Sequence, residues 1–172
     1  MKKVYVSWHD VQRQVQELVR QMWLDQWTPD YVVGITRGGL TPANLVSQYL
    51  DCRMETLRVR LQDGNSEECE SNLWMPEDAL AGKKILIVDD INDSGATLNW
   101  IKQDWETSTV AEWTSIWNSN VRVAVLYDNE CSQSQLSPDY AAETINKFEN
   151  PQWIVFPWEE WWRRWNPEEQ HQ

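Results

Sequence analysis

Two aspartates follow the most apolar stretch of the chain. Residues 84–88 (Lys-Ile-Leu-Ile-Val) predict a buried strand, and Asp89 and Asp90 come directly after it. Because ligands bind beyond the carboxyl ends of the strands in open α/β sheets, both carboxylates lie where a ligand is expected. They can accept hydrogen bonds from sugar hydroxyls or help to hold Mg²⁺. A solvated acidic turn is the weaker interpretation, because Asp93 adds a third carboxylate that repels the other two.

The next residues predict a site for a phosphate group. The segment Asp93-Ser94-Gly95-Ala96-Thr97 reads as a turn that opens a helix. Small residues there expose backbone N–H groups, and the serine and threonine add hydroxyls, so the helix N-terminus can bind an anion. Carboxylates that can bind a diol, placed beside a phosphate site, together describe a phosphorylated ribose.

A second polar loop follows another predicted strand. Residues 31–35 form a continuous apolar run that is typical of a strand buried on both faces, and Thr36, Arg37, Gly38 and Gly39 come after it. Arg37 is a fixed cation, and the glycines allow the backbone to approach a ligand closely, which suits phosphate or pyrophosphate. From these residues alone, a tight turn with a surface arginine is an equally good interpretation.

Strand patterns and helix patterns alternate along the chain. Besides the two strands above, apolar runs predict strands near 4–6, 54–59, 121–126 and 152–156, with amphipathic helices between them. This alternation predicts an α/β fold with a mainly parallel sheet. Residues 61–82 are polar and acidic, and we expect them to form a mobile loop.

Composition excludes several classes of protein. The 172 residues favour one domain, and the 15 basic and 27 acidic residues give a net charge of −12. Such a charge argues against binding to nucleic acid or to an anionic membrane. No apolar run approaches the length of a membrane span, and the N-terminus turns polar too early for a signal peptide. Three cysteines without a CxxC pair indicate no disulfide framework and no zinc site, so we expect a reducing cytoplasm.

The C-terminal tail is rich in tryptophan. Trp158, Trp161, Trp162 and Trp165 have the spacing of one helix face. We expect a C-terminal helix that docks on the body of the protein. A contact between subunits is the alternative, and a membrane-surface helix is the weakest one, because the polar face has no excess of cations.

The segment Val-Asp-Asp-Ile-Asn-Asp-Ser-Gly-Ala-Thr-Leu, residues 88–98, resembles the phosphoribosyl-pyrophosphate motif of type I phosphoribosyltransferases. Further matches place the chain nearest to the bacterial xanthine-guanine phosphoribosyltransferases and their phage-type relatives. They occur in the same order, at residues 5–8, 36–40, 153–154 and 157–159. The resemblance covers most of residues 4–160, and it is weak across 61–80 and 104–120.

This resemblance implies a fold and a reaction. The fold would be a parallel core sheet flanked by helices, with a small hood built from the chain ends. A phosphoribosyltransferase domain would span residues 1–160, with 61–82 as a mobile lid, and a tail helix would span 157–172. The reaction would be Mg²⁺-dependent transfer of a 5-phosphoribosyl group from phosphoribosyl pyrophosphate to a purine base. We also expect a homo-oligomer, either a dimer or a tetramer.

The resemblance also implies roles for individual residues. The 5′-phosphate would bind at residues 93–97, namely Asp93, Ser94, Gly95, Ala96 and Thr97. The ribose hydroxyls would be bound by Asp89 and Asp90, either directly or through Mg²⁺.

The remaining implied roles concern the pyrophosphate and the base. Arg37 and Gly38 would bind the pyrophosphate, in this family often beside a non-proline cis peptide. Asp93 would lie near the purine N7 as general acid and base. Trp153 would stack on the base, and the backbone of Ile154 would contact its edge. From the sequence alone, a core aromatic in a buried strand is an equal alternative for Trp153.

One departure from the family bears on the base. Purine phosphoribosyltransferases carry a lysine near the end of the penultimate strand that recognises the 6-oxo group. The matching residues here are Leu126-Tyr127-Asp128-Asn129-Glu130, which include no lysine. Asp128 would repel a carbonyl oxygen, whereas Asn129 could donate to it. The alternative function is therefore a non-catalytic regulatory module that binds phosphoribosyl pyrophosphate or a nucleotide.

Overall fold

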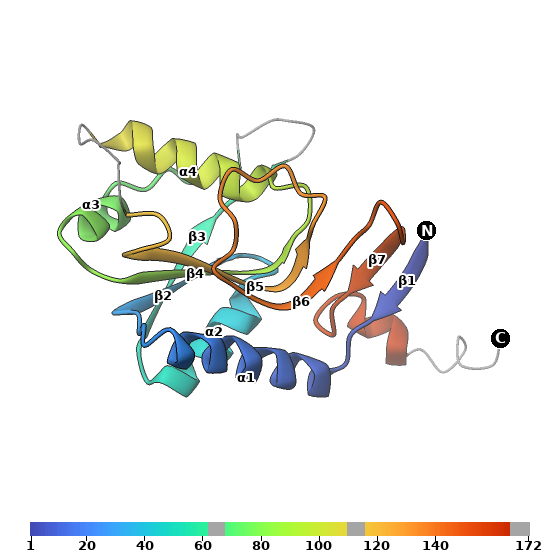
Figure 1. Ribbon diagram of the computed structural model, residues 1–172. Coiled ribbons are helices and arrows are strands. Elements are labelled where there is room, and N and C mark those ends of the chain that lie inside the picture. Colours follow the sequence, from blue (N-terminus) through green and yellow to red (C-terminus); the bar gives the residue numbers. More distant parts are fainter. Residues whose placement is uncertain (62–67, 110–115, 166–172) are drawn as a thin grey trace.

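A parallel sheet of five strands forms the centre of the molecule (Figure 1). The computed structural model describes residues 1–61, 68–109 and 116–165. Every neighbouring pair in this sheet is parallel, which confirms the predicted α/β fold. The spatial order is β3 (Arg53–Arg58), β2 (Tyr31–Thr36), β4 (Ile85–Asn92), β5 (Val121–Asn129) and β6 (Tyr140–Ile145).

Helices cover both faces of this sheet. Figure 1 shows α1 (Trp8–Leu24) and α2 (Leu40–Leu50) on one side, and α3 (Trp74–Leu80) and α4 (Ala96–Ser108) on the other. Successive strand residues point to opposite faces, so Leu86 and Val88 pack toward α1 and α2, while Ile85 and Ile87 pack toward α3 and α4. Burial on both faces explains why the central strands are continuously apolar.

The two chain ends form the small hood that we expected. Strand β1 (Lys2–Tyr5) pairs in parallel with β7 (Gln152–Val155) in a separate two-stranded sheet. Aromatic contacts join this hood to the body. Phe156 stacks on Trp158 at 4.9 Å between ring centroids, Trp8 lies 6.0 Å from Trp158, and Tyr127 of β5 meets Phe156 edge-on.

The tail up to residue 165 differs from the predicted helix, and residues 166–172 of that prediction lie outside the described residues. Trp158 lies in a turn within the aromatic contacts above, and the chain then forms a short 3₁₀ helix, η1 (Trp161–Trp165). Arg163 and Glu160 form an i,i+3 ion pair, which suits the tighter helix. The Glu159 carboxylate accepts a hydrogen bond from the Phe156 N–H at 2.9 Å, which fixes the turn.

The expected loop at 61–82 is also different in its second half. Helix α3 occupies part of this range, and Met75 and Ala79 on it are buried against the sheet. This half therefore belongs to the body of the protein, whereas residues 62–67 of the predicted lid lie outside the described residues.

The parallel arrangement brings the carboxyl ends of β2, β4, β5 and β6 to one edge of the sheet. The loops after these strands therefore lie together, as we expected for the two polar loops. Among the helices that the structure describes, no helix has both the length and the apolar character needed to cross a membrane.

Candidate active site

Asp89 and Asp90 lie within the C-terminal half of β4, which continues to Asn92 and does not stop at residue 88 as predicted, and both border a large cavity. Asp89 is only 8% exposed, and its Oδ1 accepts a hydrogen bond from the Asp90 N–H at 2.9 Å. Oδ1 of Asp90 accepts from the Ile91 N–H at 2.8 Å. Both carboxylates line a cavity of about 1030 Å³, which Arg37 also lines. The structure thus places the acidic pair where a ligand can reach it.

The surroundings of the pair disfavour its negative charge. Burial raises the pKa of Asp89 well above its ordinary value, and the neighbouring charge of Asp90 adds to this effect. Burial raises the pKa of Asp90 to about 6, and the nearby Glu159 carboxylate contributes. A bound cation would relieve this repulsion, and Mg²⁺ prefers one or two carboxylates together with phosphate oxygens and water. The residues present therefore fit a magnesium ion.

The glycine loop is pressed against this acidic pair. A Cβ atom at Gly38 would collide with the Asp90 carboxylate, and one at Gly39 would collide with the backbone oxygen of Val88. The glycines are thus required by the close approach of the β2–α2 loop to β4. We expected these glycines to allow close approach of a ligand. The structure shows that they allow close packing against the neighbouring strand. The peptide bond between Thr36 and Arg37 in this loop is cis.

Three arginines line the same cavity. Arg37 and Arg58 are exposed, and neither forms an ion pair within the described parts of the chain. Arg60 pairs with Glu68 at 2.8 Å. The cavity therefore combines two largely buried carboxylates with three cationic side chains, which suits a polyanion that carries hydroxyl groups.

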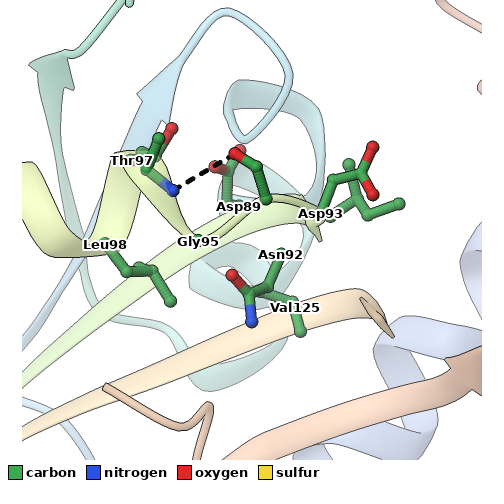
Figure 2. Close-up of a pocket in the computed structure, with 10 residues that line it drawn as sticks. Asp89, Asn92, Asp93, Gly95, Thr97, Leu98 and Val125 are labelled. Atoms are coloured by element: carbon green, nitrogen blue, oxygen red, sulfur yellow. Dashed lines mark hydrogen bonds between the residues drawn. The ribbon is translucent and has the colours of Figure 1, made fainter. Parts of the chain in front are cut away.

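A small second pocket of about 80 Å³ adjoins the first, and Asp89 and Thr97 line both of them. Figure 2 shows it around the turn between β4 and α4, with Asp89 and Asn92 on the strand and Thr97 and Leu98 on the helix. All five residues of the predicted phosphate site line this pocket, namely Asp93, Ser94, Gly95, Ala96 and Thr97. The pocket therefore has the residues and the helix N-terminus that an anion requires.

Gly95 gives this turn its shape. It has a φ of 88°, and a Cβ atom there would collide with the backbone of Ser134. It is also the N-cap of α4, with no side-chain hydrogen bond to the helix. Ser94 accepts a hydrogen bond from the Ala96 N–H at 3.3 Å. The first turn of α4 thus faces the pocket at a position that only glycine can occupy without strain.

Asp93, which directly follows β4, lies beside Asn129 at the end of β5 and Lys147 in the connection between β6 and β7. Its Oδ1 accepts a hydrogen bond from the Asn129 amide at 3.2 Å, and its Oδ2 lies 2.6 Å from the Lys147 ammonium. The same ammonium lies 5.6 Å from the centroid of the Trp153 ring. The structure therefore brings the predicted general base and the predicted stacking residue together, with Lys147 between them.

Trp153 and Ile154 occupy β7 in the hood. The Trp153 side chain is 51% exposed, so the alternative interpretation of a core aromatic is wrong. Ile154 is buried and pairs with Val4 of β1, which holds the strand in place. Strand β7 thus exposes the Trp153 indole and buries the Ile154 side chain.

Sequence reasoning missed three residues of this site, namely Arg58, Lys147 and Glu159. The two arginines at 58 and 60 carry a usable signal, since alternate positions at a strand end face the same side. No signal marks Lys147, because its place depends on how the connection between β6 and β7 folds.

Comparison with known proteins agrees with this geometry. Residues 3–163 match the family model described as the phosphoribosyl transferase domain. The xanthine-guanine phosphoribosyltransferase of Cereibacter sphaeroides is 31% identical over 166 residues, which cover 92% of this chain and 87% of that protein. The enzyme of the same name from Idiomarina loihiensis is 26% identical, with 92% and 88% covered. This chain belongs to the phosphoribosyl transferase domain family.

A solved structure supports the same assignment. The crystal structure of the purine phosphoribosyltransferase from Pyrococcus horikoshii superimposes with a TM-score of 0.67 and 28% sequence identity, covering 93% of this chain and 96% of that one. The resemblance stated from the sequence is thereby confirmed, and so is the type I fold.

The raised pKa of Asp90 predicts that a substitution that removes its charge stabilises the folded protein, and that this effect depends on pH. Above about pH 6 the Asp90 carboxylate is charged in the folded protein, where burial disfavours the charge. It is also charged in the unfolded chain, but there water solvates it. Asp90→Asn keeps an oxygen for the Ile91 N–H and removes the charge. Urea denaturation without Mg²⁺ should show a free energy of unfolding higher by on the order of 1 kcal/mol at pH 7.5, with a smaller gain at pH 4.5.

Asp51→Asn, at the exposed end of α2, is the matched control and should change stability little at either pH. A less stable Asp90→Asn protein at pH 7.5, or an equal gain at both pH values, would contradict the burial argument.

Proposed function

We propose that this chain transfers the 5-phosphoribosyl group of phosphoribosyl pyrophosphate to a ring nitrogen of a purine base and releases pyrophosphate. The observation that carries the proposal is the meeting, at one edge of the sheet, of an anion pocket, a largely buried carboxylate pair and an exposed indole near Lys147, the ion-pair partner of Asp93. The relatives from Cereibacter sphaeroides and Idiomarina loihiensis, both xanthine-guanine phosphoribosyltransferases, support a purine as acceptor.

The donor would lie across the two adjoining pockets. Its 5′-phosphate would take the small pocket at residues 93–97, and its hydroxyls would face Asp89 and Asp90. The pyrophosphate would extend into the larger cavity toward Arg37, Gly38 and Arg58. When bound at the acidic pair, Mg²⁺ would offset the negative charge that develops on the leaving group.

In the reaction, the bond between the sugar C1 and the pyrophosphate oxygen breaks, and a bond between C1 and the base nitrogen forms. Arg37 would stabilise the departing pyrophosphate. The incoming base loses a proton, and Asp93 would accept it; the hydrogen bond from the Asn129 amide, which holds the Asp93 carboxylate, supports this role. The base would stack on Trp153, beside the backbone of Ile154.

We further propose that the chain works as a homo-oligomer in the cytoplasm. The exposed side chains of Trp23, Leu24 and Tyr49 at neighbouring ends of α1 and α2 support association, because their apolar surface faces outward. The three cysteines are free, which suits a reducing compartment.

Solution mass tests the oligomer. Light scattering should give a dimer or a tetramer, and Trp23→Ser with Leu24→Ser should lower that mass without unfolding the chain. The substitution Phe148→Ser is the matched control. It should leave the mass unchanged, because this exposed side chain lies near the candidate active site and away from the ends of α1 and α2. A monomeric wild-type protein at micromolar concentration would refute the proposal.

An assay of product formation tests the proposed reaction. The chain, phosphoribosyl pyrophosphate and Mg²⁺ should give a nucleotide with at least one of guanine, xanthine, hypoxanthine and adenine, and none with uracil. Asp89→Asn should remove most of this activity, because the carboxylate serves the sugar and the metal. Retained donor binding without nucleotide from any base would favour the regulatory module, and full activity of Asp89→Asn would refute its role.

The role of Asp93 predicts a particular kinetic defect. Asp93→Asn keeps an oxygen for the Asn129 amide but cannot accept a proton, so kcat should fall by about 100-fold or more. KM for phosphoribosyl pyrophosphate should change much less. A variant with normal kcat and raised KM would show that Asp93 binds substrate but moves no proton.

A further inference from the structure

Lys147 lies at the centre of the predicted base site although the family motif does not include it. It belongs to the connection between β6 and β7, and its side chain is only 15% exposed. Its ammonium contacts Asp93 at 2.6 Å and lies 5.6 Å from the Trp153 ring centroid. A lysine that is this well buried needs a reason, because its charge is costly to desolvate.

The backbone around Lys147 is held in place by two asparagines. The Lys147 N–H donates to Asn129 Oδ1 at 3.2 Å. The side-chain oxygen of the preceding Asn146 accepts from the N–H groups of Phe148 and Glu149, at 3.1 and 3.0 Å. These bonds order the connection, so the ammonium position is built into the fold.

The residues that replace the family lysine already have other partners. The Asn129 amide nitrogen donates both to the backbone oxygen and to Oδ1 of Asp93, each at 3.2 Å. The Asp128 carboxylate accepts from the Asn92 amide at 2.8 Å. Asn129 is thus occupied in positioning Asp93, and Asp128 in joining β5 to β4. Neither is left to donate to a base.

We propose that Lys147 is the specificity-determining residue for the base, and that its ammonium donates to a carbonyl oxygen on the six-membered ring of the purine. The inference rests on the proposed function, because it assigns the substrate class of that same site. The chain would therefore accept oxopurines and reject the aminopurine adenine.

The chemistry of the ammonium accounts for this preference. Lysine has three donors and no acceptor, so it can satisfy a carbonyl oxygen but faces the hydrogens of an amino group unfavourably. One donor stays with Asp93, and another can bond to the base. A purine that stacks on Trp153 would meet the ammonium and the Asp93 carboxylate together, so one ion pair serves both recognition and proton transfer.

Lys147→Met tests this assignment, because it keeps the length of the side chain and removes the charge. Calorimetry should show hypoxanthine binding weakened by about 10- to 100-fold, which is the range for a hydrogen bond to a charged group. Adenine binding should stay the same or improve. In turnover, the ratio of kcat/KM for hypoxanthine to that for adenine should fall by a similar factor, while KM for phosphoribosyl pyrophosphate changes little.

Two further variants keep the test decisive. Lys147→Arg retains a cation and should restore part of the preference for oxopurines. Lys102→Met removes a matched lysine, which pairs with Glu106 at 2.7 Å on α4, and should change neither binding nor turnover.

The outcomes separate this inference from the proposed function. Unchanged binding of hypoxanthine by Lys147→Met overturns the assignment of Lys147, whether or not the wild-type protein forms nucleotides. A wild-type protein that forms no nucleotide from any base overturns the proposed function instead. Loss of the preference for hypoxanthine in the Met variant and its partial return in the Arg variant would support both.

Discussion

The site depends on two adjacent, largely buried carboxylates in the C-terminal half of β4. Asp89 and Asp90 repel each other in surroundings that already disfavour charge, and Glu159 of the C-terminal segment adds to the repulsion. The glycine loop packs directly against Asp90, and a side chain at Gly38 would collide with the Asp90 carboxylate. A bound cation would offset this repulsion, and a magnesium complex of a polyanion would supply one.

The parallel sheet then collects the other groups around this pair. Strands β2, β4, β5 and β6 all end at the same edge, so residues far apart in the chain come into contact there. Asp93 and Lys147, 54 positions apart, form an ion pair, and Asn129 at the end of β5 forms hydrogen bonds with both residues. The hood brings Trp153 to the same place and is itself fixed by the stacking of Phe156 on Trp158.

The sequence predicts the parts of this structure that have strong local patterns. The central strands are apolar throughout, and the turn at 93–97 is small and polar, so both are found from residue types alone. Strand β6 escapes prediction because it lies at the sheet edge and contains alanines and a glutamate in place of an apolar run. Helix α3 escapes because it is only 7 residues long, includes Pro76 and follows an acidic, polar stretch. Lys147 escapes because the position of its connection depends on the complete fold, and no local pattern encodes it.

Calorimetry of phosphoribosyl pyrophosphate binding, with and without Mg²⁺, tests the central claim most directly. The account attributes the buried charge of Asp89 and Asp90 to a site that is completed by a metal complex of this ligand. It predicts binding that is tighter with Mg²⁺ by about tenfold or more, and an Asp89→Asn, Asp90→Asn double variant in which that dependence is lost. Equal binding with and without the metal in the wild-type protein would contradict the account.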